Sequence, residues 1–143
     1  MLPENIELEI VTPTRLLLHE TVQWVEIPGK EGYLGILPGH APLISELGIG
    51  VLNYRKGSEK HYLTIIDGYV EVLPDRVIIL AEVSERAEEI NVERSRTAAE
   101  RAKSELAKAG TGDEQWQQAS FALQRALVRL QAASQTGRPA GDH

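Results

Sequence analysis

The sequence contains no cysteine among its 143 residues, which excludes disulfide bonds, thiolate metal sites and a thiol nucleophile. It also lacks a long hydrophobic run. The longest apolar stretch is Val77 to Ala81, far short of the roughly 18 residues that a membrane-spanning helix needs. The first residues, MLPENIELEI, have neither a basic nor an apolar segment, so we expect no signal peptide. These absences together predict a cytoplasmic protein without a membrane span.

An excess of positive charge is also missing. The chain has 21 Asp and Glu residues against 15 Lys and Arg residues, for a net charge of −6, which argues against nucleic acid as the main partner. Apolar residues make up 42% and charged residues 25%, which is typical of a folded globular protein rather than a disordered one. The length suits one domain, or a smaller domain with an appendage.

Residues 75–109 contain neither glycine nor proline. The spacing of apolar residues differs between the part of the chain before the start of this segment and the part after it. Before it, apolar residues recur with period two: in IELEIV (6–11) the isoleucines and the leucine face one side and the glutamates the other. The expected strands are 6–11, 22–27, 32–37, 50–55, 61–66, 69–73 and 76–83. Many short strands bounded by turns predict an antiparallel β-sandwich over residues 1–84. So small a core would gain from docking against a larger partner.

After Ser84 the periodicity becomes helical, because residues 85–109 consist mostly of strong helix formers. The expected buried stripe of this first helix is Ile90, Ala98, Ala102 and Leu106. The second helix, over 114–135, alternates large and small residues along one seam: Trp116, Ala119, Leu123, Ala126, Leu130 and Ala133. We therefore expect an antiparallel helical hairpin over 85–136 and a disordered tail over 137–143.

The alanine-rich seam suggests that the hairpin is weakly attached. Small side chains bury little apolar area, and burial contributes only ~25 cal/mol per Å². The pattern leaves two interpretations open: a moving regulatory part, or a fixed packing hairpin. The second helix also has no acidic residue between Gln115 and Ala140, while Arg125 and Arg129 lie four residues apart. This positive side is either a solvated face or a contact for an acidic partner.

The stretch GYLGILPGHAPLISELGIG (32–50) invites a catalytic interpretation, because it combines glycines with His40. A catalytic triad would need a nucleophile and an acid, and Ser45 and Asp67 are available, but no nucleophile-elbow pattern surrounds them. The glycines match neither phosphate-binding pattern. A metal site is not expected either, because the histidines include no closely spaced pair. The stretch is therefore interpreted as tight turns and a possible interface, without catalytic residues.

One motif in this stretch, GILPGHAPL (35–43), is specific. Together with DGYVEVLPDRVIILAE (67–82) and the charged, alanine-rich hairpin, it resembles the epsilon-subunit family of bacterial F-type ATP synthases, from about Ile6 to Ala133. The resemblance implies an α+β fold, in which a sandwich of about ten strands precedes a two-helix hairpin. It also implies a non-catalytic subunit of the central rotor stalk, peripheral at the cytoplasmic face of the inner membrane. The alternative is a free-standing sandwich module whose helices clamp a soluble partner.

The resemblance further implies partners and contact residues. The partners are the gamma subunit, the ring of c subunits, and the alpha and beta subunits, which the C-terminal helix would approach. The c-ring and gamma contacts correspond to Glu31, Tyr33, His40 and Pro42. Some relatives have an acidic residue where this chain has Tyr33, and Glu31 is the neighbouring substitute. Inhibition of ATP hydrolysis would involve Arg125 and Arg129.

The resemblance also suggests a regulatory nucleotide. Several bacterial relatives bind ATP through an I/L-D-x-x-R-A motif, and this chain has Ile90-Asn91-Val92-Glu93-Arg94-Ser95 in its place. The corresponding residues are Glu85, Asn91, Arg94, Arg101 and Arg125. Because Asn91 lacks the negative charge of the aspartate, we expect no required cofactor and only weak binding of ATP.

Overall fold

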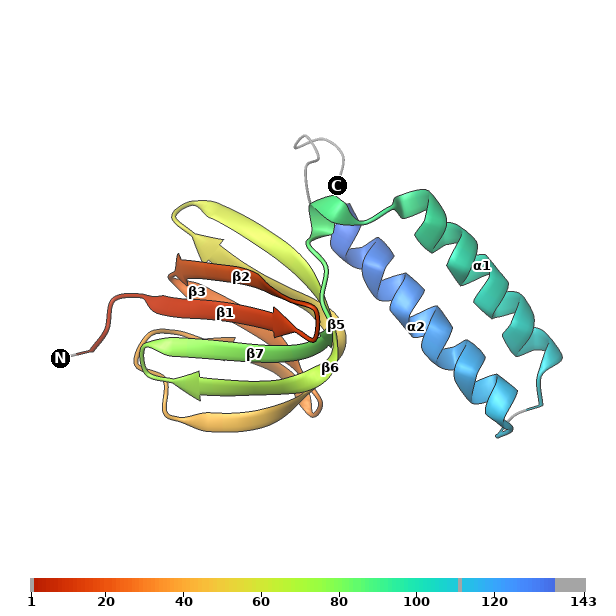
Figure 1. Ribbon diagram of the computed structural model, residues 1–143, viewed down its shortest axis with the longest axis horizontal. Helices are drawn as coiled ribbons and strands as arrows, with labels where there is room; N and C mark the ends of the chain where they lie inside the picture. The colour runs from red at the N-terminus through yellow and green to blue at the C-terminus, as the bar shows by residue number, and fades with distance from the viewer. Residues whose placement is uncertain (1, 111, 136–143) are drawn as a thin grey trace. The chain divides into compact units, whose positions relative to one another are not determined.

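The computed structural model describes residues 2–110 and 112–135, which form seven strands, one 3₁₀ turn and two helices (Figure 1). The elements are β1 (Ile6–Thr12), β2 (Arg15–Val22), β3 (Trp24–Gly29), β4 (Gly32–Ile36), β5 (Leu43–Lys56), β6 (Glu59–Leu73), β7 (Arg76–Val83), η1 (Ala87–Glu89), α1 (Val92–Lys108) and α2 (Glu114–Ser134). The chain divides into two compact units, one up to Arg86 and one from Ala87 onward.

The strands of the first unit form one continuous sheet in the order β2-β1-β7-β6-β5-β3-β4. All neighbours are antiparallel except β1 and β7, which are parallel. β5 and β6 run through two layers. Their pairing over 43–47 and 68–72 continues into β7, β1 and β2, whereas their pairing over 49–56 and 59–66 continues into β3 and β4. The sheet folds over on itself in this way to make a sandwich (Figure 1).

The fold-over is made at Gly48 and Asp67, the one missing pair in an otherwise regular β5–β6 register. Asp67 has φ = 58° and Gly68 has φ = 127°, conformations that side chains with a Cβ rarely adopt. The bend interrupts the ladder for one residue and does not end either strand. Because β5 and β6 each run through the bend as one strand, the structure has seven strands, fewer than the roughly ten that the resemblance implies. The predicted class, a sandwich followed by a helical hairpin, is confirmed.

Alternation along the strands builds the core of the sandwich. Ile6, Leu8 and Ile10 are fully buried, as their period-two pattern predicts. Side chains of both layers join them in one cluster, whose largest fully buried members also include Val22, Val25, Ile27, Ile36, Leu52, Leu63, Ile65, Val70 and Ile79. Each such side chain contributes about 1.5–3 kcal/mol by leaving water. The alternation leaves the intervening side chains on the outer faces.

The second unit is a helical hairpin whose first helix begins later than predicted. α1 starts at Val92, not at residue 85, because Asn91 is its N-cap: the Asn91 side chain accepts a hydrogen bond from the Arg94 N–H at 2.9 Å. The residues before the cap form the η1 turn. Helix-forming composition alone does not fix a helix start; the capping residue does.

The later start changes which residues α1 buries. Its buried stripe consists of Ser95, Ala99, Ala102 and the half-buried Leu106. Ala98 was predicted to belong to this stripe and is exposed. The prediction extended four-residue steps from Ile90, but Ile90 precedes the helix and does not share its periodicity.

The predicted seam of α2 is confirmed for its small residues, and the helix also buries Val128 and Ala132, which the prediction did not include. Its small residues Ala119, Ala126 and Ala133 are buried, and its large residues Trp116, Leu123 and Leu130 are half-buried. The small side chains allow α1 and α2 to approach closely. The predicted disordered tail, 137–143, lies outside the described residues.

Candidate docking surface

The turn between β3 and β4 carries two charged residues. Lys30 is held to β5 twice: its N–H donates to the Glu46 carbonyl at 3.0 Å, and its Nζ lies 3.0 Å from Glu46 Oε2. The hydrogen bond to Glu46, and then the charge of Glu46, raise the pKa of Lys30 above its ordinary value. Glu31 follows in the turn and is exposed. The turn therefore presents an exposed carboxylate next to an ion pair that fixes it to β5.

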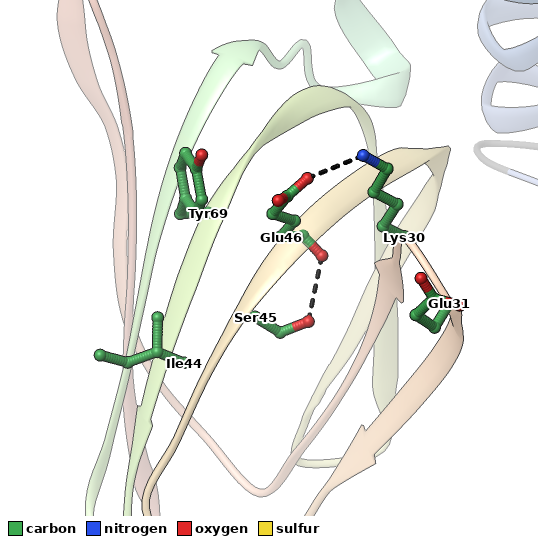
Figure 2. Close-up of a pocket in the computed structure, with 6 residues that line it drawn as sticks. All are labelled: Lys30, Glu31, Ile44, Ser45, Glu46 and Tyr69. Atoms are coloured by element: carbon green, nitrogen blue, oxygen red, sulfur yellow. Dashed lines mark hydrogen bonds and ion pairs between the residues drawn. The ribbon is translucent and has the colours of Figure 1, made fainter.

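An open hollow of about 440 Å³ lies beside this turn (Figure 2). It is lined by Lys30, Glu31, Ile44, Ser45, Glu46 and Tyr69. Ser45 Oγ donates to the Glu46 carbonyl at 3.1 Å. Ile44 and Tyr69 give the hollow an apolar side, and Glu31 and Glu46 give it an acidic side. Such a lining suits a protein segment with apolar and polar or basic side chains.

The four residues predicted to contact the c ring and the gamma subunit fall into two pairs. Glu31 and Tyr33 lie at the β3–β4 turn. His40 and Pro42 lie in the loop between β4 and β5, so the five residues of β4 separate them from the turn. His40 Nδ1 is 2.7 Å from the carbonyl oxygen of Ala41, a local contact within this loop. The structure places the two pairs at opposite ends of β4.

A row of apolar side chains crosses the outer face of the layer that contains β2, β1 and β7. In the strand registers Leu80 lies opposite Tyr69 on one side and Val11 on the other, and Val11 lies opposite Leu16. Leu16, Leu80 and Tyr69 are 57%, 54% and 55% exposed. Ile44, 71% exposed, is a diagonal neighbour of Tyr69 on β5. These five residues are named the outer apolar row, and contiguous exposed apolar surface of this kind marks a protein contact.

The outer apolar row was not predicted from the sequence. In the sequence, the feature that indicates this row is the apolar run from Val77 to Ala81 in β7. Val77 and Ile79 are buried there, yet the outward positions between and after them, Ile78 and Leu80, are apolar as well. A strand with one face in water normally carries polar residues at outward positions. The sequence of β7 alone therefore shows the departure from alternation. The outer apolar row as a whole depends on how the strands pair and is not visible in one segment.

A second open hollow, of about 400 Å³, lies on α1. It is lined by Asn91, Glu93, Arg94, Thr97, Ala98 and Arg101. Three of the five residues predicted for nucleotide binding therefore share one surface: Asn91, Arg94 and Arg101. Two guanidinium groups on one helix face provide the donors that a phosphate group prefers. The Asn91 side-chain oxygen is already engaged as the N-cap.

The other two predicted nucleotide residues lie elsewhere. Glu85 belongs to the first unit, where its carbonyl accepts from the Thr64 N–H at 2.9 Å and its own N–H donates to Thr64 Oγ1 at 3.0 Å. The next residue, Arg86, makes a separate contact with the sandwich: its Nη2 donates to the Leu17 carbonyl at 2.8 Å. We name Glu85 and Arg86 the strap. Arg125 lies on α2 and is half-buried.

The predicted inhibitory residues, Arg125 and Arg129, lie one turn apart on α2, and both are half-buried. After Glu114 no further acidic residue occurs in the helix. The charged side chains of α2 beyond its first turn are therefore all positive.

The described residues hold no cluster of three or more His, Asp or Glu side chains that could bind a metal ion. None of the hydrogen bonds found within 2–110 and 112–135 joins His40, Ser45 and Asp67, the three residues weighed as a triad. In that same part of the chain, no helix is long and apolar enough to cross a membrane.

Two sequence models of one family match successive parts of the chain. The ATP synthase, Delta/Epsilon chain, beta-sandwich domain matches residues 5–87, and the long alpha-helix domain of the same chain matches residues 88–134. The chain belongs to the ATP synthase delta/epsilon family. The border between the two family domains falls one residue after the division of the structure at Arg86.

Curated members of the family are similar to the chain over most of its length. The ATP synthase epsilon chain of Solibacter usitatus is 45% identical over 132 residues, which cover 92% of this chain and 98% of the relative. That of Syntrophobacter fumaroxidans is 48% identical over 134 residues, covering 93% and 98%. That of Koribacter versatilis is 51% identical over 107 residues, covering 75% of each chain.

Solved structures of ATP synthase complexes contain chains with a similar fold. A chain of the Euglena gracilis mitochondrial ATP synthase, in a complex of OSCP, F1 and c-ring, matches with a TM-score of 0.80 and 28% identity, covering 93% of this chain and 83% of that one. A chain from the Tetrahymena thermophila mitochondrial ATP synthase central stalk and c-ring, at 14% identity and a TM-score of 0.55, shares the fold alone. These findings give no support to the alternative of a free-standing binding module.

Proposed function

We propose that this chain is the epsilon subunit in the central stalk of a bacterial, proton-translocating F-type ATP synthase. It couples rotation of the c ring to ATP synthesis and catalyses no reaction itself. The observation that carries the proposal is the match to both family domains in order, together with the likeness to a chain of an F1 and c-ring complex. The subunit would lie at the cytoplasmic face of the membrane, where its partner subunits hold it.

The sandwich would supply the docking surface in this assembly. The outer apolar row suits the gamma subunit, because burying several large side chains of this kind contributes several kcal/mol to association, about 1.5–3 kcal/mol for each one fully buried. The charged turn with Lys30 and Glu31, beside the hollow of Figure 2, suits the polar loops of the c ring. His40 and Pro42 would extend the contact surface at the other end of β4.

Co-purification tests the docking surface. A tagged Leu80→Glu variant should recover at least about tenfold less gamma subunit than the parent, because a carboxylate replaces a central apolar contact. Phe121→Glu is the matched control: Phe121 on α2 is 53% exposed and Leu80 is 54% exposed. The control should recover gamma as the parent does. Full recovery with Leu80→Glu, or equal loss in both variants, contradicts the docking role of the row.

The helical hairpin would inhibit ATP hydrolysis through Arg125 and Arg129. Facing carboxylates of a catalytic beta subunit, partly desolvated arginines contribute a few kcal/mol, against less than ~1 kcal/mol for a solvated ion pair. The double variant Arg125→Ala and Arg129→Ala should therefore hydrolyse ATP faster in the assembled enzyme and leave proton-driven synthesis nearly unchanged. The gain should shrink at high salt, since screening already weakens the parent contact. If the double variant hydrolyses ATP at the parent's rate across a salt series, the two arginines do not take part in the inhibitory contact.

ATP would act on this chain only as a weak regulatory ligand. Arg94 and Arg101 offer donors for phosphate groups, but Asn91 has no charge, and its side-chain oxygen is engaged as the helix cap. Calorimetric titration of the isolated chain should find weak binding or none, and Asn91→Asp should strengthen it. Tight binding by the parent chain would contradict this assignment.

A further inference from the structure

The ladder between β3 and β5 is interrupted next to the β3–β4 turn. It is regular as far as the pair Glu26 and Asn53, and it resumes only at Gly29. If the first register continued for two residues, Pro28 would face Val51. Proline has no N–H to donate to a ladder, and β5 has extra residues over this stretch, so it bulges away from β3. The interruption leaves the Val51 N–H without a partner on β3.

Tyr33 supplies the missing partner. Its hydroxyl oxygen accepts a hydrogen bond from the Val51 N–H at 3.1 Å. Tyr33 lies directly opposite Pro28 in the β3–β4 ladder, so its side chain crosses over Pro28 from β4 to β5. Val51 is buried, and a buried N–H without an acceptor is costly. The hydrogen bond thus links three neighbouring strands at the one place where the ladder fails.

The tyrosine ring fits closely over the bulge because residue 50 is a glycine. A Cβ at Gly50 would lie 2.5 Å from the Tyr33 hydroxyl oxygen and 2.7 Å from Pro28 Cβ. Real Cβ atoms essentially never come that close to another heavy atom. The space above Gly50 is therefore filled by the end of the Tyr33 side chain.

We propose that Tyr33 is a positioning residue that fixes the β3–β4 turn against β5 for docking to the c ring. β4 is an edge strand, paired only with β3. Besides the strand pairing, three ties join this hairpin to β5: Lys30 with its two contacts to Glu46, the hydrogen bond from the Asn53 side chain to Glu26, and the Tyr33–Val51 hydrogen bond. Of these three, the Tyr33–Val51 hydrogen bond is the one that starts from β4. The Tyr33 hydroxyl accepts from Val51 within the sandwich, and the exposed carboxylate of this turn is that of Glu31. Only the last step, from turn position to docking, rests on the proposed function.

The test compares Tyr33→Phe with Tyr69→Phe in the full chain. Both changes remove one hydroxyl group from a tyrosine of similar exposure, 52% and 55%. In Tyr33→Phe, residue-resolved amide exchange should be about tenfold faster at Val51, because its acceptor is lost. Exchange at the Lys30 amide should also become faster, and the pKa of Lys30 should fall toward its ordinary value as the turn separates from Glu46. Tyr69→Phe should leave both amides unchanged.

Unchanged exchange at the Val51 amide in Tyr33→Phe would show that the Tyr33 hydroxyl does not protect this amide, and would contradict the proposal. Faster exchange at Val51 with an unchanged Lys30 amide and an unchanged Lys30 pKa would overturn the positioning role. Docking is measured separately, as binding of each full-length variant to detergent-solubilised c ring from the same enzyme. Tyr33→Phe should bind at least about threefold more weakly than the parent, and equal binding would overturn the step to docking. If the parent itself does not bind the c ring, the proposed function fails, while the exchange result still decides the role of Tyr33.

Discussion

At the scale of single residues, Gly68 has the least room for a side chain. A Cβ there would overlap the carbonyl oxygen of Leu80 and lie 2.9 Å from the Cα of Ala81, and φ is +127°. Both obstacles are main-chain atoms of β7, so neither can rotate away. Gly68→Ala should therefore lower the free energy of unfolding by roughly 4 kcal/mol or more, as measured by urea denaturation of the full chain.

Gly57→Ala is the control for this prediction. Gly57 also has a positive φ, +65°, but nothing lies within 4 Å of an added Cβ. Its cost should be only about 1 kcal/mol, the strain of the backbone conformation alone. Equal losses in the two variants would mean that φ, not overlap with β7, decides the cost at Gly68.

Glu7 gives the sandwich a pH dependence. The hydroxyl of Thr21 donates to Glu7 Oε1 at 2.6 Å, and His19 Nε2 lies 3.1 Å from Oε2. The Thr21 hydrogen bond is the largest cause that lowers the pKa of Glu7 below its ordinary value of 4.5; His19 lowers it further, while desolvation opposes the shift. A lowered folded pKa means that ionised Glu7 stabilises the fold above the ordinary value. This stabilisation is lost as the pH falls through the lowered pKa.

Glu7→Gln should therefore lower the Tm near neutral pH and have little effect in strong acid, at about pH 2. Because Glu7 lies near the surface, the shift in Tm should be a few degrees at most. Thermal unfolding of parent and variant across a pH series measures it. In a Thr21→Val background most of the difference should disappear. A difference in Tm that is the same at both pH values would contradict the assignment.

At the scale of elements, the start of α1 depends on one side chain. Asn91→Ala removes the acceptor of the Arg94 N–H and should destabilise the hairpin by about 1 kcal/mol. Asn91→Asp keeps the acceptor and adds a negative charge at the helix N-terminus, so it should not destabilise α1. Amide exchange at Arg94 measures both effects. Faster exchange in Asn91→Asp than in the parent would contradict this account of the cap.

Element types were predictable from the sequence, whereas element ends were less so. Period-two patterns identified most of the strands and the inward side chains of β1, because alternation is a local property of the chain. They missed β2 and divided β6 into two strands. The strand count that the resemblance implied was too high, since β5 and β6 each continue through the bend at Gly48 and Asp67 as one strand. The α1 stripe was displaced because Ile90 was counted as helical, although the cap at Asn91 comes after it.

The candidate site was less predictable, because it depends on pairing between distant strands. Leu80 and Tyr69 each look like an ordinary outward position, and only the register of β6 with β7 makes them neighbours in a row. Tyr33 could be named from the family resemblance, but its hydrogen bond to Val51 follows from an interrupted ladder at Pro28. No spacing within a single segment contains that information.

At the scale of the whole molecule, the strap decides where the sandwich can be cut from the chain. Thr64 is fully buried, and both its N–H and its hydroxyl are partnered by the main chain of Glu85. A fragment of residues 1–86 should fold by itself. A fragment of residues 1–84 should be less stable by about 1–3 kcal/mol, because Thr64 loses those partners.

Urea denaturation of the two fragments checks this difference. A third fragment, residues 1–90, is the control, since its extra residues belong to the second unit and should add little. Equal stability of 1–84 and 1–86 would show that the strap does not contribute to the sandwich. Failure of 1–86 to fold would contradict the division of the chain into two units.

The passage of β5 and β6 through both layers has a mechanical consequence. In a sandwich made of two separate sheets, the layers are joined by loops and by side-chain contacts, and a sideways force can shift one across the other. Here two adjacent strands continue from one layer into the other and stay paired on both sides of the bend. A twisting load applied to β5 beside the β3–β4 turn would therefore pass into the opposite layer along the covalent backbone of β5 and β6. We expect the two layers to twist together under torque, and to flex relative to each other mainly at Gly48 and Asp67.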